Sequence, residues 1–227
     1  MQTEAFKELF PLFNSASPDT LAALNNVVVE HEYPTNRAVL MEDSWGNAVY
    51  FIASGWVKVR RHSGDNVFTL AILGKGDFFG EMAILDESPR STDVIALSPV
   101  KLFSISAQQF IQTLFQDSQL HHRMLQLMVK RLRQTNLRFQ LTRQPSAIKL
   151  AHTLVALAQQ YGEPSETGRK LLNIPEEDLA NIADISADDT HKIMEKLVSK
   201  EWIQIDETTQ ILHLKNERQL IQLSQRR

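Results

Sequence analysis

The chain has 227 residues, enough for two modest cores, and its 43% hydrophobic and 22% charged side chains are typical of a globular protein. It contains no run of 18 apolar residues, and its first ten residues lack the pattern of a signal peptide, so we expect a cytoplasmic protein without a membrane span. The absence of cysteine excludes disulfides, iron–sulfur clusters and thiolate zinc sites.

The net charge of −3 is unevenly distributed. Residues 1–116 carry 8 basic and 13 acidic side chains, residues 117–144 carry 6 and 1, and residues 145–227 carry 10 and 13. The positive charge therefore lies in the middle of the chain, whereas the total charge indicates no particular partner.

In chain order, the pattern first predicts short helices at 5–13 and 18–26, and then short strands from residue 27 to about 106. The strand segments are rich in Val, Ile and Phe, and turn signals such as GKGD at 74–77 separate them. Many short strands with close turns predict an antiparallel barrel or sandwich.

Beyond residue 106 the pattern becomes helical, with one helix at 108–115 and a longer one at 120–143 that contains neither Gly nor Pro. The longer helix carries a coiled-coil seam at alternating steps of three and four residues. Because one helix cannot bury such a seam alone, it packs on its own domain or on a second copy, and a symmetric homodimer is the simplest arrangement. The seam residues are Leu125, Met128, Leu132, Thr135 and Phe139.

Pro145 ends this helix, because proline disfavours the helical conformation at the residue before it. Helices are then expected at 146–160, 176–183 and 187–199, followed by two strands around the polar turn of WIQID-ETTQ-ILHL. Three helices and a hairpin in this order are the layout of a winged helix-turn-helix.

The most specific segment is FFGEMAILDESPRSTDVIAL, residues 78–97. Arg90 presents a planar fork of donors that stays charged and can grip both exposed oxygens of a cyclic phosphate. Backbone N–H groups at a helix start attract the same anion, and Ser91 and Thr92 add hydroxyl donors. Gly80 lets the backbone approach where a Cβ would clash. A lone Glu and Arg would indicate only a surface ion pair, but the whole string favours a ligand site.

Glu81 lies beside the expected phosphate, where its negative charge would repel the ligand. Its carboxylate can accept a hydrogen bond from a ribose 2′-hydroxyl, while Arg90 offsets its charge. This arrangement favours a ribonucleotide over a deoxyribonucleotide.

These residues resemble the phosphate-binding cassette of the cyclic-AMP receptor protein (Crp-Fnr) family, F-G-E-x-A-L-L followed by P-R-[AS]-[AT], with Ile84 where Leu is usual. The resemblance extends over nearly the whole chain in the same order. It implies a cyclic nucleotide, cAMP before others, as allosteric ligand, and no metal, haem or iron–sulfur cluster. The ligand-binding residues that it implies are Gly80, Glu81, Met82, Arg90, Ser91 and Thr92.

The resemblance also implies an α+β architecture. A jelly-roll-like β-roll that binds the cyclic nucleotide would cover residues 1–116, a dimerisation helix 117–144, and a winged helix-turn-helix DNA-binding domain 145–227. Such a protein is not an enzyme but a cytoplasmic homodimer that regulates transcription on double-stranded DNA, with RNA polymerase as a further candidate partner. The ligand would bridge the roll to the partner's helix and re-aim the C-terminal domains.

Two further positions follow from aligning Arg131-Leu132 with the family's Arg-Leu. Thr135 then stands at the Thr, and Asn136 at the Ser, that contact adenine in the resembling proteins. Thr135 can equally be a polar residue that sets the register of the seam. Asn136 departs from Ser, so the choice between cAMP and cGMP stays open.

The helix-turn-helix segment, residues 175–200, offers Ser186 as N-cap of a recognition helix whose first turns would meet base edges. The family's S-R-E-T-V-G-R reads S-A-D-D-T-H-K here, so both guanine-reading arginines are absent. The exposed candidates are Ala187, Asp188, Thr190, His191 and Lys192, and the expected DNA-binding residues are Ser186, Asp188, Thr190, His191 and Lys192.

The acidic character of residues 145–227 leaves an alternative, because binding phosphates favours positive charge. The C-terminal domain of a cyclic-nucleotide-sensing dimer would then have lost DNA reading and would bind a protein partner. His121 and His122 point about 100° apart on a helix and do not suggest a metal or haem site. The sequence indicates neither the operator, nor the target genes, nor activation as opposed to repression.

Overall fold

The computed structural model describes residues 3–64 and 66–225 and divides the chain into two compact units, Met1–Gln134 and Thr135–Arg227. The long helix α5 (Ser118–Leu141) contributes residues to both units. The two units are described separately below. Among the helices of the described residues, none combines the length and apolar character that crossing a bilayer requires.

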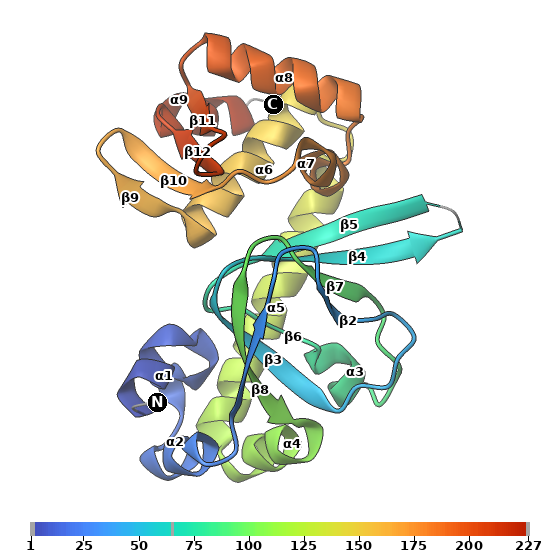
Figure 1. Ribbon diagram of the computed structural model, residues 1–227, viewed down its shortest axis with the longest axis vertical. Helices are drawn as coiled ribbons and strands as arrows, with labels where there is room; N and C mark the ends of the chain where they lie inside the picture. The colour runs from blue at the N-terminus through green and yellow to red at the C-terminus, as the bar shows by residue number, and fades with distance from the viewer. Residues whose placement is uncertain (1–2, 65, 226–227) are drawn as a thin grey trace. The chain divides into compact units, whose positions relative to one another are not determined.

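The first unit contains a roll of two four-stranded antiparallel sheets (Figure 1). One sheet has the order β1-β8-β3-β6 and the other the order β2-β7-β4-β5. The strands are β1 (Val29–Tyr33), β2 (Ala38–Leu40), β3 (Ala48–Ser54), β4 (Val57–Ser63), β5 (Asn66–Leu73), β6 (Phe78–Phe79), β7 (Asp93–Ala96) and β8 (Val100–Ser106).

Strand β3 shows how the alternation of side chains builds the two cores of this unit. Ile52 lies in a cluster to which both sheets contribute, and Tyr50 packs against that cluster. Val49 and Phe51 belong instead to a cluster shared with helical segments, which include α4 and the start of α5. The helical segments of this unit besides α5 are α1 (Thr3–Leu9), the 3-10 helix η1 (Pro11–Ser15), α2 (Pro18–Asn25), α3 (Glu81–Leu85) and α4 (Ala107–Gln116).

The second unit is a winged helix. Its sheet has the antiparallel order β11-β12-β10-β9 (Figure 1). Helix α6 contributes eight buried residues to the core of this unit. The elements are α6 (Ser146–Tyr161), β9 (Glu163–Ser165), β10 (Gly168–Leu172), α7 (Glu176–Ala183), α8 (Ala187–Ser199), β11 (Ile203–Asp206), β12 (Ile211–Leu214) and α9 (Glu217–Ser224).

The α+β fold class, the antiparallel roll and the three helices before a hairpin are confirmed. The single helix expected at 5–13 is wrong, because Pro11 lacks the N–H that would continue α1 and begins a separate 3-10 turn instead. The sequence reading also missed the hairpin β9–β10 and the helix α9, which complete the second unit. Strands of three and five residues are too short to show a clear period.

Candidate functional site

The cassette of residues 78–93 is a strand, a tight turn, one short helix and a second turn. Gly80 lies between β6 and α3 with a left-handed φ of 85°, which favours glycine. A Cβ built on Gly80 would lie 2.6 Å from Nη1 of Arg90, and one built on Gly46 would lie 2.6 Å from its Cζ. Two glycines from separate loops therefore make room for a single guanidinium.

Arg90 is turned into the roll, with only 3% of its surface exposed. Its Nη2 donates to the carbonyl oxygen of Ala48 at 2.7 Å, and its Nη1 donates to that of Gly80. Burial lowers the pKa of the Arg90 guanidinium, while Tyr50 and Glu81 act in the opposite direction. The guanidinium keeps its charge at neutral pH because an arginine pKa lies far above 7. A fixed, desolvated cation of this kind is well suited to an anionic ligand.

Glu81, the first residue of α3, is also buried, at 2% exposure. Burial raises the pKa of its carboxyl group above the ordinary 4.5, against an attraction from Arg131 that favours the charged form. Arg131 reaches from α5: its Nη1 donates to Glu81 Oε1, and its Nη2 donates to the carbonyl oxygen of Phe78. The Arg131 guanidinium also lies 4.3 Å from the centre of the Phe78 ring.

Arg131 is thus a site residue that the sequence reading used only for alignment. Its ion pair with Glu81 joins positions 50 residues apart, so no local spacing announces it. The charge of Glu81 is offset first by Arg131 and more weakly by Arg90, whereas the sequence reading named Arg90 alone. The cassette and α5 are therefore electrostatically linked within the first unit.

The remaining expected ligand residues are exposed or half-buried. Met82 on α3 is 63% exposed, Ser91 is exposed, and Thr92 is half-buried just before β7. Thr135 and Asn136 are exposed residues of α5 that belong to the second unit, whereas the cassette belongs to the first.

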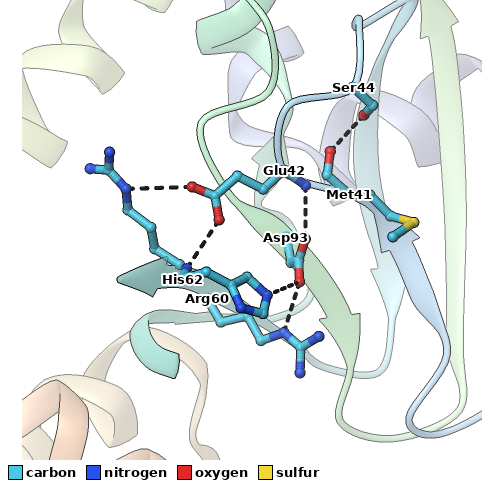
Figure 2. A network of polar contacts seen from close by, with 7 residues as sticks. Met41, Glu42, Ser44, Arg60, His62 and Asp93 are labelled. Atoms are coloured by element: carbon cyan, nitrogen blue, oxygen red, sulfur yellow. Dashed lines mark hydrogen bonds and ion pairs between the residues drawn. The ribbon is translucent and has the colours of Figure 1, made fainter. Parts of the chain in front are cut away.

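Asp93, the last residue of the cassette, is the centre of a network of polar contacts (Figure 2). Its carboxylate accepts hydrogen bonds from the backbone N–H of Glu42 at 2.8 Å, from Arg60 Nε at 2.9 Å and from the His62 ring at 3.1 Å. Burial would raise the pKa of Asp93, but these hydrogen bonds lower it below the ordinary 3.8. The sequence analysis did not single out Asp93, although a carboxylate directly before three apolar residues, 94–96, could have indicated a buried charge.

In the second unit, Ser186 caps α8 as expected, since its side chain accepts the backbone N–H of Asp189 at 3.0 Å. Thr190 is fully buried and its hydroxyl donates to the carbonyl oxygen of Ser186, so the expectation that Thr190 is exposed is wrong. It lies four and seven residues before Met194 and Leu197 on the buried face of α8.

His191 and Lys192, two exposed donors near the start of α8, are paired with carboxylates of the same unit. Lys192 donates to Asp188 at 2.6 Å, and this hydrogen bond raises the pKa of Lys192. The ring of His191 lies 3.1 Å from Glu176 and 3.6 Å from Glu195. The first turns of α8 thus present alternating charges rather than a positive surface.

Comparison with known proteins gives a family match for part of the first unit and relatives that cover most of the chain. Residues 30–117 match the family described as cyclic nucleotide-binding domain. The cyclic AMP receptor protein of Thermus thermophilus is 27% identical over 192 residues, which cover 84% of this chain and 86% of that protein. A CRP-like cAMP-activated global transcriptional regulator of Mycobacterium tuberculosis is 25% identical over 200 residues, with 86% and 88% covered.

Solved structures show the same fold. FixK2 from Bradyrhizobium japonicum matches with a TM-score of 0.76 at 16% identity, covering 88% of this chain and 99% of that one. The catabolite activator protein of Thermus thermophilus matches with a TM-score of 0.52 at 24% identity, over 94% and 98%. At these identities the structures support the fold alone.

Proposed function

We propose, from the premise that this chain carries a cyclic nucleotide-binding domain and is homologous to CRP-like transcription regulators, that it is a transcription regulator controlled by a cyclic nucleotide, cAMP in the first place. The proposed division is a sensor roll over residues 1–116, a dimerisation helix over 117–144 and a DNA-binding winged helix over 145–227. The protein works in the cytoplasm, has no catalytic activity of its own, and has RNA polymerase as a candidate contact.

The observation that carries the proposal is the buried guanidinium of Arg90 between Gly46 and Gly80. Its two terminal nitrogens now donate to neutral backbone carbonyls. The oxygens of a cyclic phosphate are charged acceptors and form stronger hydrogen bonds with the same planar fork. The anion is then surrounded by Gly80, Met82, Ser91 and Thr92. Glu81 accepts a hydrogen bond from the ribose 2′-hydroxyl.

The exposed apolar residues of α5 support a homodimer. Of the expected seam, Leu125 and Leu132 are 55% and 60% exposed and Phe139 is 82% exposed, whereas Met128 packs against the core of its own unit. Val129, which the seam did not include, is 49% exposed. A seam of this kind is buried when two copies pair along it. In such a dimer Thr135 and Asn136 contact the base and pass the binding signal along the helix.

The DNA-reading residues we propose are Ser186, Asp188, His191 and Lys192. Asp188 can accept from the N4 amino group of cytosine, and Lys192 can donate to guanine or phosphate. The internal pairing of these charges favours a second candidate, in which the C-terminal domain binds a protein partner instead.

Titration calorimetry with cAMP and cGMP on the wild type and on Arg90→Ala tests the sensor function. We expect micromolar or tighter binding of one ligand by the wild type and a loss of at least about 100-fold in Arg90→Ala, because two charge-assisted hydrogen bonds disappear. Arg37→Ala, which removes an exposed arginine of the same unit, is the matched control and keeps wild-type affinity. No heat from either ligand on the folded wild type contradicts the proposal.

A gel shift against random duplexes, with and without the ligand, tests the second half of the proposal. Ligand-dependent retardation of DNA supports regulation of transcription. Ligand binding without retardation of any duplex favours the protein-binding alternative.

A further inference from the structure

Asp93 begins strand β7 three residues after Arg90 and is 4% exposed. The residues that follow it, Val94, Ile95 and Ala96, are buried and apolar. A carboxylate at such a position is costly unless donors surround it. Its three donors come from two places: the loop that follows β2, through Glu42, and strand β4, through Arg60 and His62 (Figure 2).

The loop that Asp93 holds forms two backbone hydrogen bonds with Arg90. The N–H of Asp43 donates to the carbonyl oxygen of Arg90 at 2.8 Å, and the N–H of Arg90 donates to that of Ser44 at 2.8 Å. Trp45 and Pro89 form a β-bridge one step further on. The segments 42–45 and 89–93 are therefore fastened together, with the carboxylate of Asp93 at one end.

A second set of contacts holds the loop from its other side. Glu42 accepts the backbone N–H of His62 at 3.0 Å, and its carboxylate lies 3.5 Å from Arg61 Nε. The loop also leads directly to Gly46, whose missing Cβ leaves room for the Arg90 guanidinium. A shift of this loop would therefore move both the backbone of Arg90 and one wall around its side chain.

We propose that Asp93 is a positioning residue for the nucleotide: by holding the loop 42–46 against the backbone of Arg90, it fixes the guanidinium where the phosphate binds. The inference rests on the proposed function, since it concerns the same ligand. Asp93 acts through Arg90 and does not itself touch the ligand.

A purely structural carboxylate in the same unit provides the comparison. Asp117 is 7% exposed and accepts the backbone N–H groups of Ser17 and Leu120 and the hydroxyl of Thr20. It is as well provided with donors as Asp93, but it caps α5 and holds no part of the cassette. Asp117→Ala is therefore comparable to Asp93→Ala in burial, and it removes no fewer hydrogen bonds, because Asp117 also accepts the backbone N–H of Gln119.

Calorimetry on the full chain at a temperature where every variant is folded separates the two roles. We expect Asp93→Ala to weaken cAMP binding about tenfold, as the loss of one or two hydrogen bonds to a charged group would. Asp93→Asn keeps an oxygen that accepts the N–H of Glu42 and stays within about threefold of the wild type. Asp117→Ala lowers the melting temperature and leaves the dissociation constant unchanged.

Equal affinity in Asp93→Ala and the wild type, or an equal loss in Asp117→Ala, overturns the proposal. If Asp93→Ala does not fold, Asp93→Ser, whose side chain is shorter but polar, replaces it, and an affinity equal to that of the wild type overturns the proposal in the same way.

Amide hydrogen exchange in the absence of ligand keeps this test independent of the proposed function. We expect the amides of Asp43 and Arg90 to exchange about tenfold faster in Asp93→Ala and to keep their wild-type rates in Asp117→Ala. Unchanged exchange in Asp93→Ala overturns the positioning role. A wild type that binds neither cAMP nor cGMP contradicts the proposed function instead, whatever the exchange rates show.

Discussion

The cassette of the first unit and helix α8 of the second unit differ in where their charged candidate residues lie: buried in the cassette and exposed on α8. Arg90, Glu81 and Asp93 are each less than 5% exposed and are held by backbone groups or by partly exposed side chains of other elements. On α8, by contrast, exposed charged side chains pair across a helical turn, His191 with Glu195 and Lys192 with Asp188. Buried charges have fixed positions and few alternatives, whereas exposed pairs are screened and readily exchanged. Single substitutions should therefore have large effects in the cassette and small ones in α8.

Among substitutions that leave the Arg90 side chain in place, the largest effect is expected from Gly46→Ala. The new Cβ would lie 2.6 to 2.8 Å from three atoms of the Arg90 guanidinium, which must move away from its carbonyl partners. We expect cAMP affinity to fall roughly 10- to 100-fold, because both charge-assisted hydrogen bonds to the phosphate depend on this position. Calorimetry provides the measurement.

The control for Gly46→Ala is Gly64→Ala, whose Cβ meets nothing within 4 Å but whose φ of 59° strains any other residue. That variant should lose roughly 1 kcal/mol of stability and keep its affinity. An unaltered affinity in Gly46→Ala would show that the guanidinium is less firmly placed than its burial indicates.

The next effect concerns pH. The pKa of Asp93 is lowered by its hydrogen bonds, so its stabilising contribution is complete above about pH 4 and is lost as the pH falls through its folded pKa. The pKa of Glu81 is raised by burial, so its contribution is complete below its ordinary 4.5 and is lost as the pH rises through its folded pKa. The two carboxyls thus give stability profiles of opposite slope.

Urea unfolding of the full chain between pH 3 and 7 measures both slopes, with Trp202→Phe as background so that fluorescence reports the first unit. We expect the acid-side loss of about 2 kcal/mol to shrink in Asp93→Asn. Glu81→Gln should remove the opposite slope, so that its stability relative to the wild type increases with pH. Profiles of equal slope in all three proteins would contradict the assignment of these pKa shifts.

The contrast between the two regions also explains what the sequence could reveal. Short strands, turns and helices follow from local periodicity, and Arg90, Gly80 and Glu81 belong to one contiguous string. The pairing of Arg131 with Glu81 depends on how α5 packs on the roll, which no local pattern encodes. Thr190 is different, because its spacing from Met194 and Leu197 already indicated a buried position. Thr190 was nevertheless placed among the DNA-reading residues, because these were chosen from the family's pattern and not from the helical spacing of the buried positions.

The smallest effect is expected in α8 and separates DNA reading from protein binding. Lys192→Gln should weaken binding to any duplex about threefold to tenfold at low salt and reduce the salt slope by about one, because a single phosphate contact is lost. Asp188→Asn should strengthen binding to duplexes of unrelated sequence by a few fold, since it removes the negative charge that pairs with Lys192 at 2.6 Å. Fluorescence anisotropy over a salt series with cAMP present measures both, and Lys75→Gln on the first unit is the matched exposed control. If Lys192→Gln and Asp188→Asn leave the salt slope at its wild-type value, α8 does not meet phosphates, and its alternating charges are better explained by a protein partner of complementary pattern.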